Sequence, residues 1–430
     1  MHGHRWASLA LVAAVAVLAA ACASASPGTA SLRGQRIEVL AVWSGAEAAR
    51  FGRVITGFEA ATGASVSYTS EPSGVPAALA ARVASGSVPD VAFLPQPGTL
   101  RQYAAQGRLM PLDAATAGLV GSNYGSVWRG LGSYQGRLYG VWFKAADKSL
   151  VWYRVAAFEQ AGVVPPATLD RLMTVARRFS ASGLAAFAVG GSDRWTLTDW
   201  FENLYLDVAG PSGYDLLATH RRPWTDPSVR TTLGLMESVL APELVAGGTA
   251  GMLSTTFRQS VDQVFGARPA AAMTSEGDFV AGVVSSDTGA VLGVDADAFP
   301  FPPFAGSPSG VVGGGDVAVM LRRSPAADAF LRYLATPEAA ARWASEGGFI
   351  SPNLNLDPSV YPDPITRFEA RGLLDAGDSF RFDLSDLQPP AFGSTPTAGM
   401  EGELAAFLVD RDVEGTAVRL EAAARAAYGS

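Results

Sequence analysis

Cysteine and histidine are scarce in this 430-residue chain, and their scarcity excludes several classes of protein. Cys22 is the single cysteine, so no intramolecular disulfide can form and stability must come from burial of a core. Of three histidines, His2 and His4 precede an apolar N-terminal run, which leaves His220 for any catalytic role. The setting of His220, Thr-His-Arg-Arg-Pro, predicts an exposed loop, and no Gly-x-Ser-x-Gly elbow accompanies it. A Ser-His-Asp hydrolase and a His/Cys metal site are therefore disfavoured.

Positive charge is also in deficit, with a formal net charge of -8 at pH 7 and a pI near 5.1. Such a chain repels phosphate backbones, and it has no local basic patch, so we expect no nucleic-acid partner. The pattern Asp295-Ala-Asp297 is too short to argue for calcium, and no metal or cofactor is predicted. With 48% hydrophobic residues the chain can bury a large core, and its length exceeds what one core supports. We therefore predict two lobes.

The N-terminus predicts a targeting segment. The apolar run 7–21 is about 15 residues long and follows a basic start, whereas a bilayer span needs roughly 20. It ends in Leu18-Ala-Ala-Ala-Cys22, which resembles a bacterial lipobox whose cysteine thiol takes a diacylglycerol. Ala19 stands where that pattern prefers Leu, and an ordinary cleavable signal is the alternative. We predict a lipoprotein signal over 1–22, lipidation at Cys22, and a flexible tether over 23–35.

The first part of the folded body alternates strands with amphipathic helices. The pattern predicts strands at 37–42, 64–69 and 90–94, with helices at 46–61 and 75–84. This βαβαβ order predicts a mainly parallel sheet covered by helices, in which ligands lie beyond the carboxyl ends of the strands. The loops that follow these strands carry Trp43, Glu71 and Gln96.

Later segments supply a second set of elements. The apolar run Ser149–Tyr153 predicts a crossing between lobes, and helices are predicted at 169–178 and 227–239. The segment Val311–Met320 predicts two short strands joined by a glycine loop. Ser324 followed by a proline predicts the N-cap and first position of a further helix.

Several sequence blocks, taken in order, resemble a known family. From about Ile37 onward the chain resembles the extracellular solute-binding proteins of carbohydrate ABC importers, and in particular their α-glucoside-binding branch. The blocks that carry this resemblance are Val88–Val91, Gly107–Leu112, Gly347–Asn353, Leu94–Gly98, Lys148–Tyr153, Thr198–Tyr205, Pro223–Pro227, Glu276–Phe279 and Gly313–Asp316.

The resemblance implies an α/β, two-lobe fold of the type II periplasmic-binding kind, with the ligand cleft between the lobes. It divides the chain into a first lobe over 36–150 and 310–350 and a second over 151–309 and 351–430. The implied function is extracytoplasmic capture of a sugar, an α-glucoside or disaccharide, and its delivery to an ABC permease. We expect a monomer held to the outer face of the cell membrane by the lipid on Cys22.

The candidate ligand-binding residues combine aromatic rings with carboxylates and amides. A sugar offers C–H faces to a ring and hydroxyl groups to polar side chains. Trp43, Trp195, Trp200 and Trp224 sit beside polar residues in predicted loops, although core filling is the competing interpretation for each tryptophan. The candidates are Trp43, Gln96, Lys148, Gly315 and Asp316 from the first lobe, and Trp195, Asp199, Trp200, Glu276 and Asp278 from the second.

Two of these groups have a second interpretation. Glu276 and Asp278 could be the acid and nucleophile of a secreted glycoside hydrolase, yet such carboxyl groups flank a bond at about 5 to 9.5 Å and usually come from separate segments. We interpret them as hydrogen-bond acceptors for hydroxyls. The glycines before Asp316 lack the Lys-Ser/Thr ending of a phosphate loop and either admit a ligand or form a tight turn. Lys148 either donates to a sugar oxygen or pairs with a surface acid. A glycan-binding adhesin is a third functional class.

Overall fold

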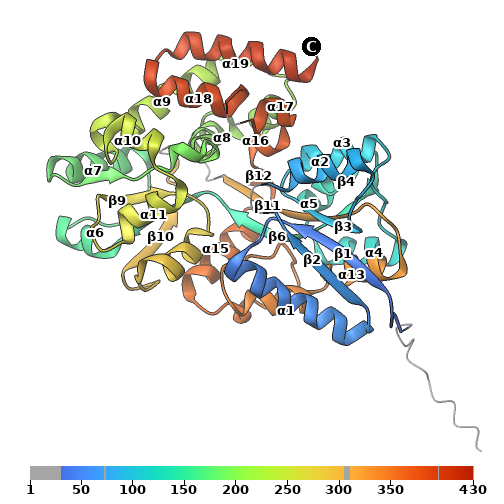
Figure 1. Ribbon diagram of the computed structural model, residues 1–430. Coiled ribbons are helices and arrows are strands. Elements are labelled where there is room, and N and C mark those ends of the chain that lie inside the picture. The colour runs from blue at the N-terminus through green and yellow to red at the C-terminus, as the bar shows by residue number, and fades with distance from the viewer. Residues whose placement is uncertain (1–30, 72–73, 305–309, 396, 430) are drawn as a thin grey trace, which may run out of the picture.

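The computed structural model describes residues 31–71, 74–304, 310–395 and 397–429 (Figure 1). The predicted signal segment, Cys22 and most of the predicted tether lie outside these residues. Within the described part of the chain, no helix combines the length and apolar character needed to cross a membrane.

Two separate sheets organise the molecule. The sheet of the first lobe has the order β12-β11-β3-β1-β2, with β6 paired to β11. The sheet of the second lobe has the order β10-β7-β9-β8. The strands of the first are β1 (Arg36–Ala41), β2 (Ser65–Ser70), β3 (Val91–Leu94), β6 (Gly140–Asp147), β11 (Val311–Met320) and β12 (Phe380–Phe382). Those of the second are β7 (Leu150–Arg154), β8 (Ala185–Phe187), β9 (Ala271–Ser275) and β10 (Ala296–Pro300), while β4 (Ser133–Tyr134) and β5 (Arg137–Leu138) pair separately.

Helices cover both sheets (Figure 1). Around the first lobe these are α1 (Gly45–Thr62), α2 (Val75–Ser85), α3 (Pro97–Ala105), α4 (Ala114–Asn123), α5 (Ser126–Leu131), α13 (Pro325–Leu334), α14 (Pro337–Ala344) and α15 (Pro364–Asp375). Around the second they are α6 (Val155–Ala161), α7 (Leu169–Ala181), α8 (Trp195–Ala218), α9 (Pro227–Val239), α10 (Gly248–Ser254), α11 (Phe257–Phe265), α12 (Val280–Val283), α16 (Leu384–Leu387), α17 (Pro390–Gly393), α18 (Gly399–Asp410) and α19 (Val413–Tyr428).

The βαβαβ start of the chain forms as its periodicity predicts. Strands β1, β2 and β3 pair in parallel, with β1 in the centre. Helix α1 buries Phe51, Val54 and Phe58 on one face and ends at Gly63, whose φ of 76° is the left-handed conformation that favours glycine. The carboxyl ends of these strands consequently lie at one edge of the first lobe, facing the second lobe.

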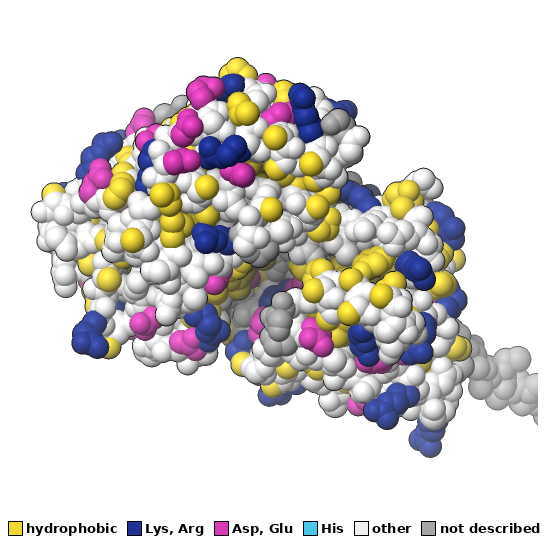
Figure 2. Space-filling model, turned by 45° about the horizontal axis from the view of Figure 1, so that its top comes forward, with side chains coloured by type: hydrophobic (Ala, Val, Ile, Leu, Met, Phe, Trp, Pro, Cys, Tyr) yellow, Lys and Arg dark blue, Asp and Glu magenta, His cyan; other side chains and the backbone are white. Residues whose placement is uncertain are grey.

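The chain crosses between the lobes next to the Lys148 segment. β6 ends at Asp147 in the first sheet and β7 begins at Leu150 in the second. The apolar run that starts at Ser149 is therefore mostly a strand of the second lobe, and the crossing itself is the short link before it. Figure 2 shows the molecule hollowed by a furrow between the two lobes.

The lobe boundary predicted near residue 351 differs from the packing in the structure. Tyr361, Ala370 and Leu373 belong to the hydrophobic core of the first lobe, and β12 extends the first sheet by pairing with β11. Ile365, at the start of α15, instead packs with a core cluster of the second lobe. The chain returns to the first lobe after residue 351 because these apolar side chains complete that core, and α15 bridges the lobes.

The glycine loop predicted within Val311–Met320 is wrong, because this segment is one continuous strand, β11. It pairs with β6 on one side, with an irregular register between Asp316 and Val317. A Cβ at Gly315 would lie 2.4 Å from the carbonyl oxygen of Lys144. The glycine therefore permits close approach of two strands rather than a turn.

Candidate functional site

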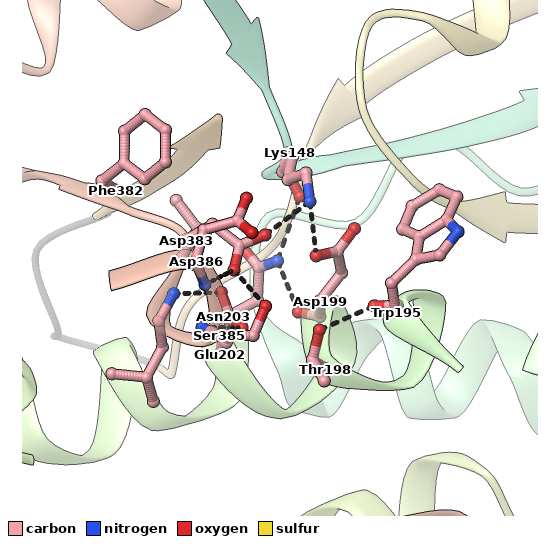
Figure 3. A network of polar contacts seen from close by, with 12 residues as sticks. Lys148, Trp195, Thr198, Asp199, Glu202, Asn203, Phe382, Asp383, Ser385 and Asp386 are labelled. Carbon is pink, nitrogen blue, oxygen red and sulfur yellow. Dashed lines mark hydrogen bonds and ion pairs between the residues drawn. The ribbon is translucent and has the colours of Figure 1, made fainter. Parts of the chain in front are cut away.

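The ammonium group of Lys148 is the centre of a buried charge network at the crossing between the lobes (Figure 3). Its Nζ lies 3.0 Å from Oδ1 of Asp199, on α8, and 2.5 Å from Oδ2 of Asp383, just after β12. The Lys148 side chain is only 12% exposed, so the interaction is largely shielded from solvent. Burial acts to lower the pKa of Lys148, but Asp199 and Asp383 outweigh it and raise that pKa well above its ordinary value. Lys148 is therefore charged and neutralised internally.

Asp383 is held in place by the start of α16. As the N-cap of this helix it accepts hydrogen bonds from the Asp386 N–H, at 3.1 Å, and the Ser385 hydroxyl, at 2.6 Å. Burial acts to raise the pKa of Asp383, but Lys148 and these donors lower it below its ordinary range. Asp383 is thus the ionised partner of Lys148.

Glu202, on α8, stabilises the same turn at the start of α16. Its carboxylate accepts hydrogen bonds from the Leu384 N–H, at 2.8 Å, and the Ser385 N–H, at 3.1 Å, and Tyr214 donates to it at 3.2 Å. Burial and the neighbouring Asp383 raise the pKa of Glu202 well above its ordinary value. One carboxylate oxygen each from Asp199, Glu202 and Asp383 lies within 4.8 Å of the others, a spacing compatible with a cation. The Lys148 ammonium already bonds two of the three.

Asp199 and Glu276 form a carboxyl pair beside Lys148. Their side chains are close enough to share a hydrogen bond when one carries a proton. Burial raises the pKa of Glu276 well above its ordinary value and that of Asp199 to about 7. Oδ2 of Asp199 and Oε2 of Glu276 are buried and accept from no donor among the described residues. An oxygen of this pair that is not engaged in the shared hydrogen bond is available to a hydroxyl group of a ligand.

Other buried polar atoms near this pair also lack partners within the described chain. Oε1 of Gln96 is one, and the Gln96 side chain meets Asp386, which connects the first lobe to the network. Oε2 of Glu401, on α18, is another, and Lys148 acts electrostatically on that carboxyl group. Unpartnered buried polar atoms are unusual in a folded core and are typical of a binding site for a polar ligand.

Trp195 is the one predicted tryptophan whose ring remains half-buried beside the network. Lys148 Nζ lies 5.3 Å from its ring centroid, and Phe257 and Phe279 pack against it at 5.5 and 5.9 Å. Phe257 and Phe279 hold the Trp195 ring in place, while part of the indole stays accessible to a ligand.

Trp43 and Trp200 lie in the cores of the lobes. Trp200 is 1% exposed between Phe187 and Phe301, and Trp43 is 1% exposed among rings that include Phe51. The indole of Trp43 donates a hydrogen bond to Asp316. The prediction that Trp195 and Trp200 stand in loops is wrong, because both lie on α8. Trp224 is fully buried as well.

A second lysine, Lys144, organises the part of the furrow that belongs to the first lobe. Its Nζ lies 2.6 Å from Oε1 of Glu47 and 5.2 Å from the centroid of the Trp343 ring. Asp316 on β11 lies directly opposite Lys144 in the backbone register of β11 and β6. Burial raises the pKa of Asp316 to about 6, while Lys144 acts against the rise.

Asp278 does not share partners with Glu276, although both follow β9. Oδ1 of Asp278 accepts from the Asp147 N–H at 2.9 Å, and the Asp278 N–H donates to the Asp147 carbonyl at 2.9 Å. Burial raises the pKa of both Asp147 and Asp278 to about 7. Asp278 therefore ties the second lobe to the crossing segment.

Sequence reasoning missed Asp383, Glu202 and Glu401 as members of the site. The helix-capping pattern that begins at Asp383 was the available signal, because an aspartate before a short apolar turn predicts an N-cap. His220 lies in a turn as predicted, but the predicted exposure is wrong, since its side chain is 8% exposed and contacts Glu421 at 3.2 Å.

Solved structures establish the fold class as a type II periplasmic-binding fold. The bacterial solute receptor AcbH, described as having an exclusive preference for β-D-galactopyranose, aligns with a TM-score of 0.77 at 20% identity over 92% of this chain and 99% of that one. RafE in complex with raffinose aligns with a TM-score of 0.73 at 18% identity over 91% of this chain and 99% of that one.

The sequence itself places the chain in a family. It belongs to the bacterial extracellular solute-binding protein family, whose model matches residues 43–341. It is 32% identical over 84% of its length to the osmoprotective compounds-binding protein GgtB of Synechocystis sp., covering 86% of that protein. It is 33% identical over 84% of its length to the α-glucosides-binding periplasmic protein AglE of Rhizobium meliloti, covering 82% of that protein. The family consists of binding proteins that act outside the cytoplasm.

Proposed function

We propose that this protein captures an uncharged sugar, an α-glucoside of disaccharide size, in the furrow between its lobes and delivers it to the permease of an ABC importer. The observation that carries the proposal is the set of buried carboxyl and amide oxygens of Asp199, Glu276, Gln96 and Glu401 that have no partner within the described chain. Sugar hydroxyls donate to such oxygens, and the half-buried Trp195 offers a ring to a C–H face.

The charge balance favours a neutral ligand. Lys148 and Lys144 are both buried, and each is already paired with a carboxylate of this chain. An anionic ligand would have to compete with those carboxylates, and a cationic one with the ammonium groups. The α-glucoside preference is supported by the similarity to the α-glucosides-binding protein AglE, while GgtB is named for osmoprotective compounds.

Binding rather than hydrolysis is supported by the geometry of the acids. A retaining glycosidase needs carboxyl groups about 5 to 5.5 Å apart on either side of the bond. Glu276 and Asp278, the pair considered for such an enzyme, follow one strand; Asp278 is bound to Asp147, and Glu276 lies close enough to Asp199 to share a hydrogen bond. We infer that ligand capture works by closure, in which residues of both lobes meet one sugar and the closed form is presented to the permease.

The proposal extends to the N-terminus and the assembly. We infer that residues 1–22 direct export, that Cys22 carries a lipid that holds the protein to the outer face of the membrane, and that the protein acts as a monomer. Incorporation of a radiolabelled fatty acid, lost in Cys22→Ser, tests the anchor.

A thermal-shift screen of the purified protein against mono- and disaccharides tests the central claim, because a ligand that binds the native state raises the melting temperature. We expect a saturable shift with an α-linked disaccharide and no product by chromatography. Product formation would establish the hydrolase alternative. No shift with any sugar would overturn the carbohydrate assignment.

A further inference from the structure

A cavity of about 650 Å³ lies apart from the Lys148 network. Its walls come from both lobes: α3, α5 and β12 of the first, and the end of α8 with α16 of the second. Phe382, one of its lining residues, lies on the opposite side of Asp383 from Lys148 in Figure 3. None of the proposed sugar-binding residues lines it. The volume suits a small organic molecule.

The cavity holds two guanidinium groups without a carboxylate partner. Arg101, on α3, is half-buried and forms no hydrogen bond or ion pair with any residue that the structure describes, and burial lowers its pKa. Arg221, after α8, donates from its side chain only to the Thr219 hydroxyl, at 3.1 Å, among the described residues. Arg381, in contrast, is neutralised by Asp215 at 2.8 Å. A half-buried cation without a counter-charge favours an anion from outside the chain.

The other residues that line the cavity indicate the chemical character of the rest of the ligand. Val127 and Leu387 give the cavity an apolar wall, and the buried rings of Phe380 and Phe382 lie directly behind it, 2% and 1% exposed. Gly130 also lines it, and a Cβ at this position would meet no atom within 4 Å. An apolar body bearing one acidic group matches this combination of guanidinium groups and apolar surface.

We propose that this cavity is a second ligand site, which takes an aromatic organic anion such as an aryl carboxylate or sulfonate. Arg101 and Arg221, from opposite lobes, face the acidic group, and Val127 and Leu387 contact the ring. Because both lobes build the walls, occupancy depends on the angle between them. If the furrow closes on a sugar as proposed above, the two ligands alter each other's affinity by the same factor.

Fluorescence titration with anilinonaphthalene sulfonate, without any sugar, tests the site directly. We expect saturable binding to one site, displaced by benzoate. Arg101→Gln is expected to weaken binding about tenfold or more, as for loss of a charged hydrogen-bond partner. Gly130→Leu, which fills the cavity, is expected to abolish it. Arg129→Gln, on the same helix as Gly130 but outside the cavity, should leave it unchanged.

The outcomes separate the two proposals. Equal dye binding by the wild type, Arg101→Gln and Gly130→Leu would overturn the site, and so would an absence of saturable binding. Circular dichroism checks that the variants fold, and Arg101→Gln, at a half-exposed position, carries the test if Gly130→Leu does not. Repeating the titration with a saturating disaccharide measures the coupling alone. A protein that binds the dye at Arg101 but no sugar would refute the proposed function and keep this site.

Discussion

Lys144 lies on β6 and Lys148 in the short link that follows it, and each ammonium group contacts a tryptophan ring, yet the two lysines have different roles. Glu47, the partner of Lys144, belongs to the same lobe and its side chain is 42% exposed. The partners of Lys148 are Asp199 and Asp383, whose side chains are 3% and 2% exposed. Lys144 shapes one wall of the furrow, whereas Lys148 connects the crossing segment to the second lobe. The comparison teaches that the burial of the carboxylate partner, more than that of the lysine, decides how much stability is lost when the lysine charge is removed.

Replacing Lys148 should have the largest effect. Lys148→Met leaves Asp199 and Asp383 buried without a counter-charge, and we expect a loss of about 3 to 5 kcal/mol in the free energy of unfolding. Lys144→Met, whose partner can turn to solvent, should cost about 1 kcal/mol or less. Urea unfolding of both variants measures the difference. Equal losses would show that the two ion pairs are equivalent.

Trp195 and Trp200, both on α8, allow a second comparison, between a ring beside the binding site and a ring in the core. Trp200→Ala removes a fully buried ring, and we expect it to cost about 3 to 5 kcal/mol in stability. Trp195→Ala should lower stability less and weaken sugar binding about tenfold, because it removes a ring face of the site. Calorimetry with the identified sugar and thermal melts separate the effects. A Trp195→Ala protein with unchanged affinity would remove this ring from the site.

Glu276→Ala should act on binding and hardly on folding. The free Oε2 of Glu276 is offered to a hydroxyl, so we expect at least about tenfold weaker sugar binding. Glu338→Ala, an exposed acid on α14, is the matched control and should leave affinity intact. Retention of wild-type affinity by Glu276→Ala would refute its role.

The last prediction concerns the pH dependence of stability. Burial raises the pKa of Asp147 and Asp278 from 3.8 to about 7 in the folded protein, so the protonated forms are favoured by folding. Their contribution is fully present below the unfolded pKa and is lost as pH rises through about 7. The free energy of unfolding measured in urea should therefore be lower at pH 8 than at pH 5.

Asp147→Asn isolates that contribution. An asparagine keeps the acceptor for the Ser149 N–H but cannot ionise, so the decline between pH 5 and pH 8 should become shallower. Asp170→Asn, at an exposed position, should reproduce the wild-type profile. A wild-type slope in Asp147→Asn would assign the pH dependence to other groups.

The sequence predicted the parts of this molecule that depend on local patterns. The alternation from β1 to β3 follows from apolar spacing and turn residues, and α9 begins and ends as predicted, at Pro227 and Val239. The glycines of β11 were misread because their function is to admit the Lys144 backbone, a contact between distant strands. No local pattern gives that information.

The candidate site was predictable in part for the same reason. Lys148, Asp199 and Glu276 were selected from blocks of resemblance, and the structure brings them together. Asp383, which is 235 residues from Lys148, was missed because only the fold places it there. Trp195 and Trp200 lie at different positions on α8, one half-buried beside the network and one in the core, and a loop assignment could not reveal this.

The position of β11 and β12 in the first sheet has a consequence for biosynthesis. β6 and β3 meet their partner β11 only after the whole of β7 to β10 has been made, and β12 follows at residue 382. The first lobe therefore cannot complete its sheet until residue 382 has emerged, and closing such distant pairs is slow. For a chain that is exported, this delay would keep the polypeptide in a state that can still be threaded across a membrane.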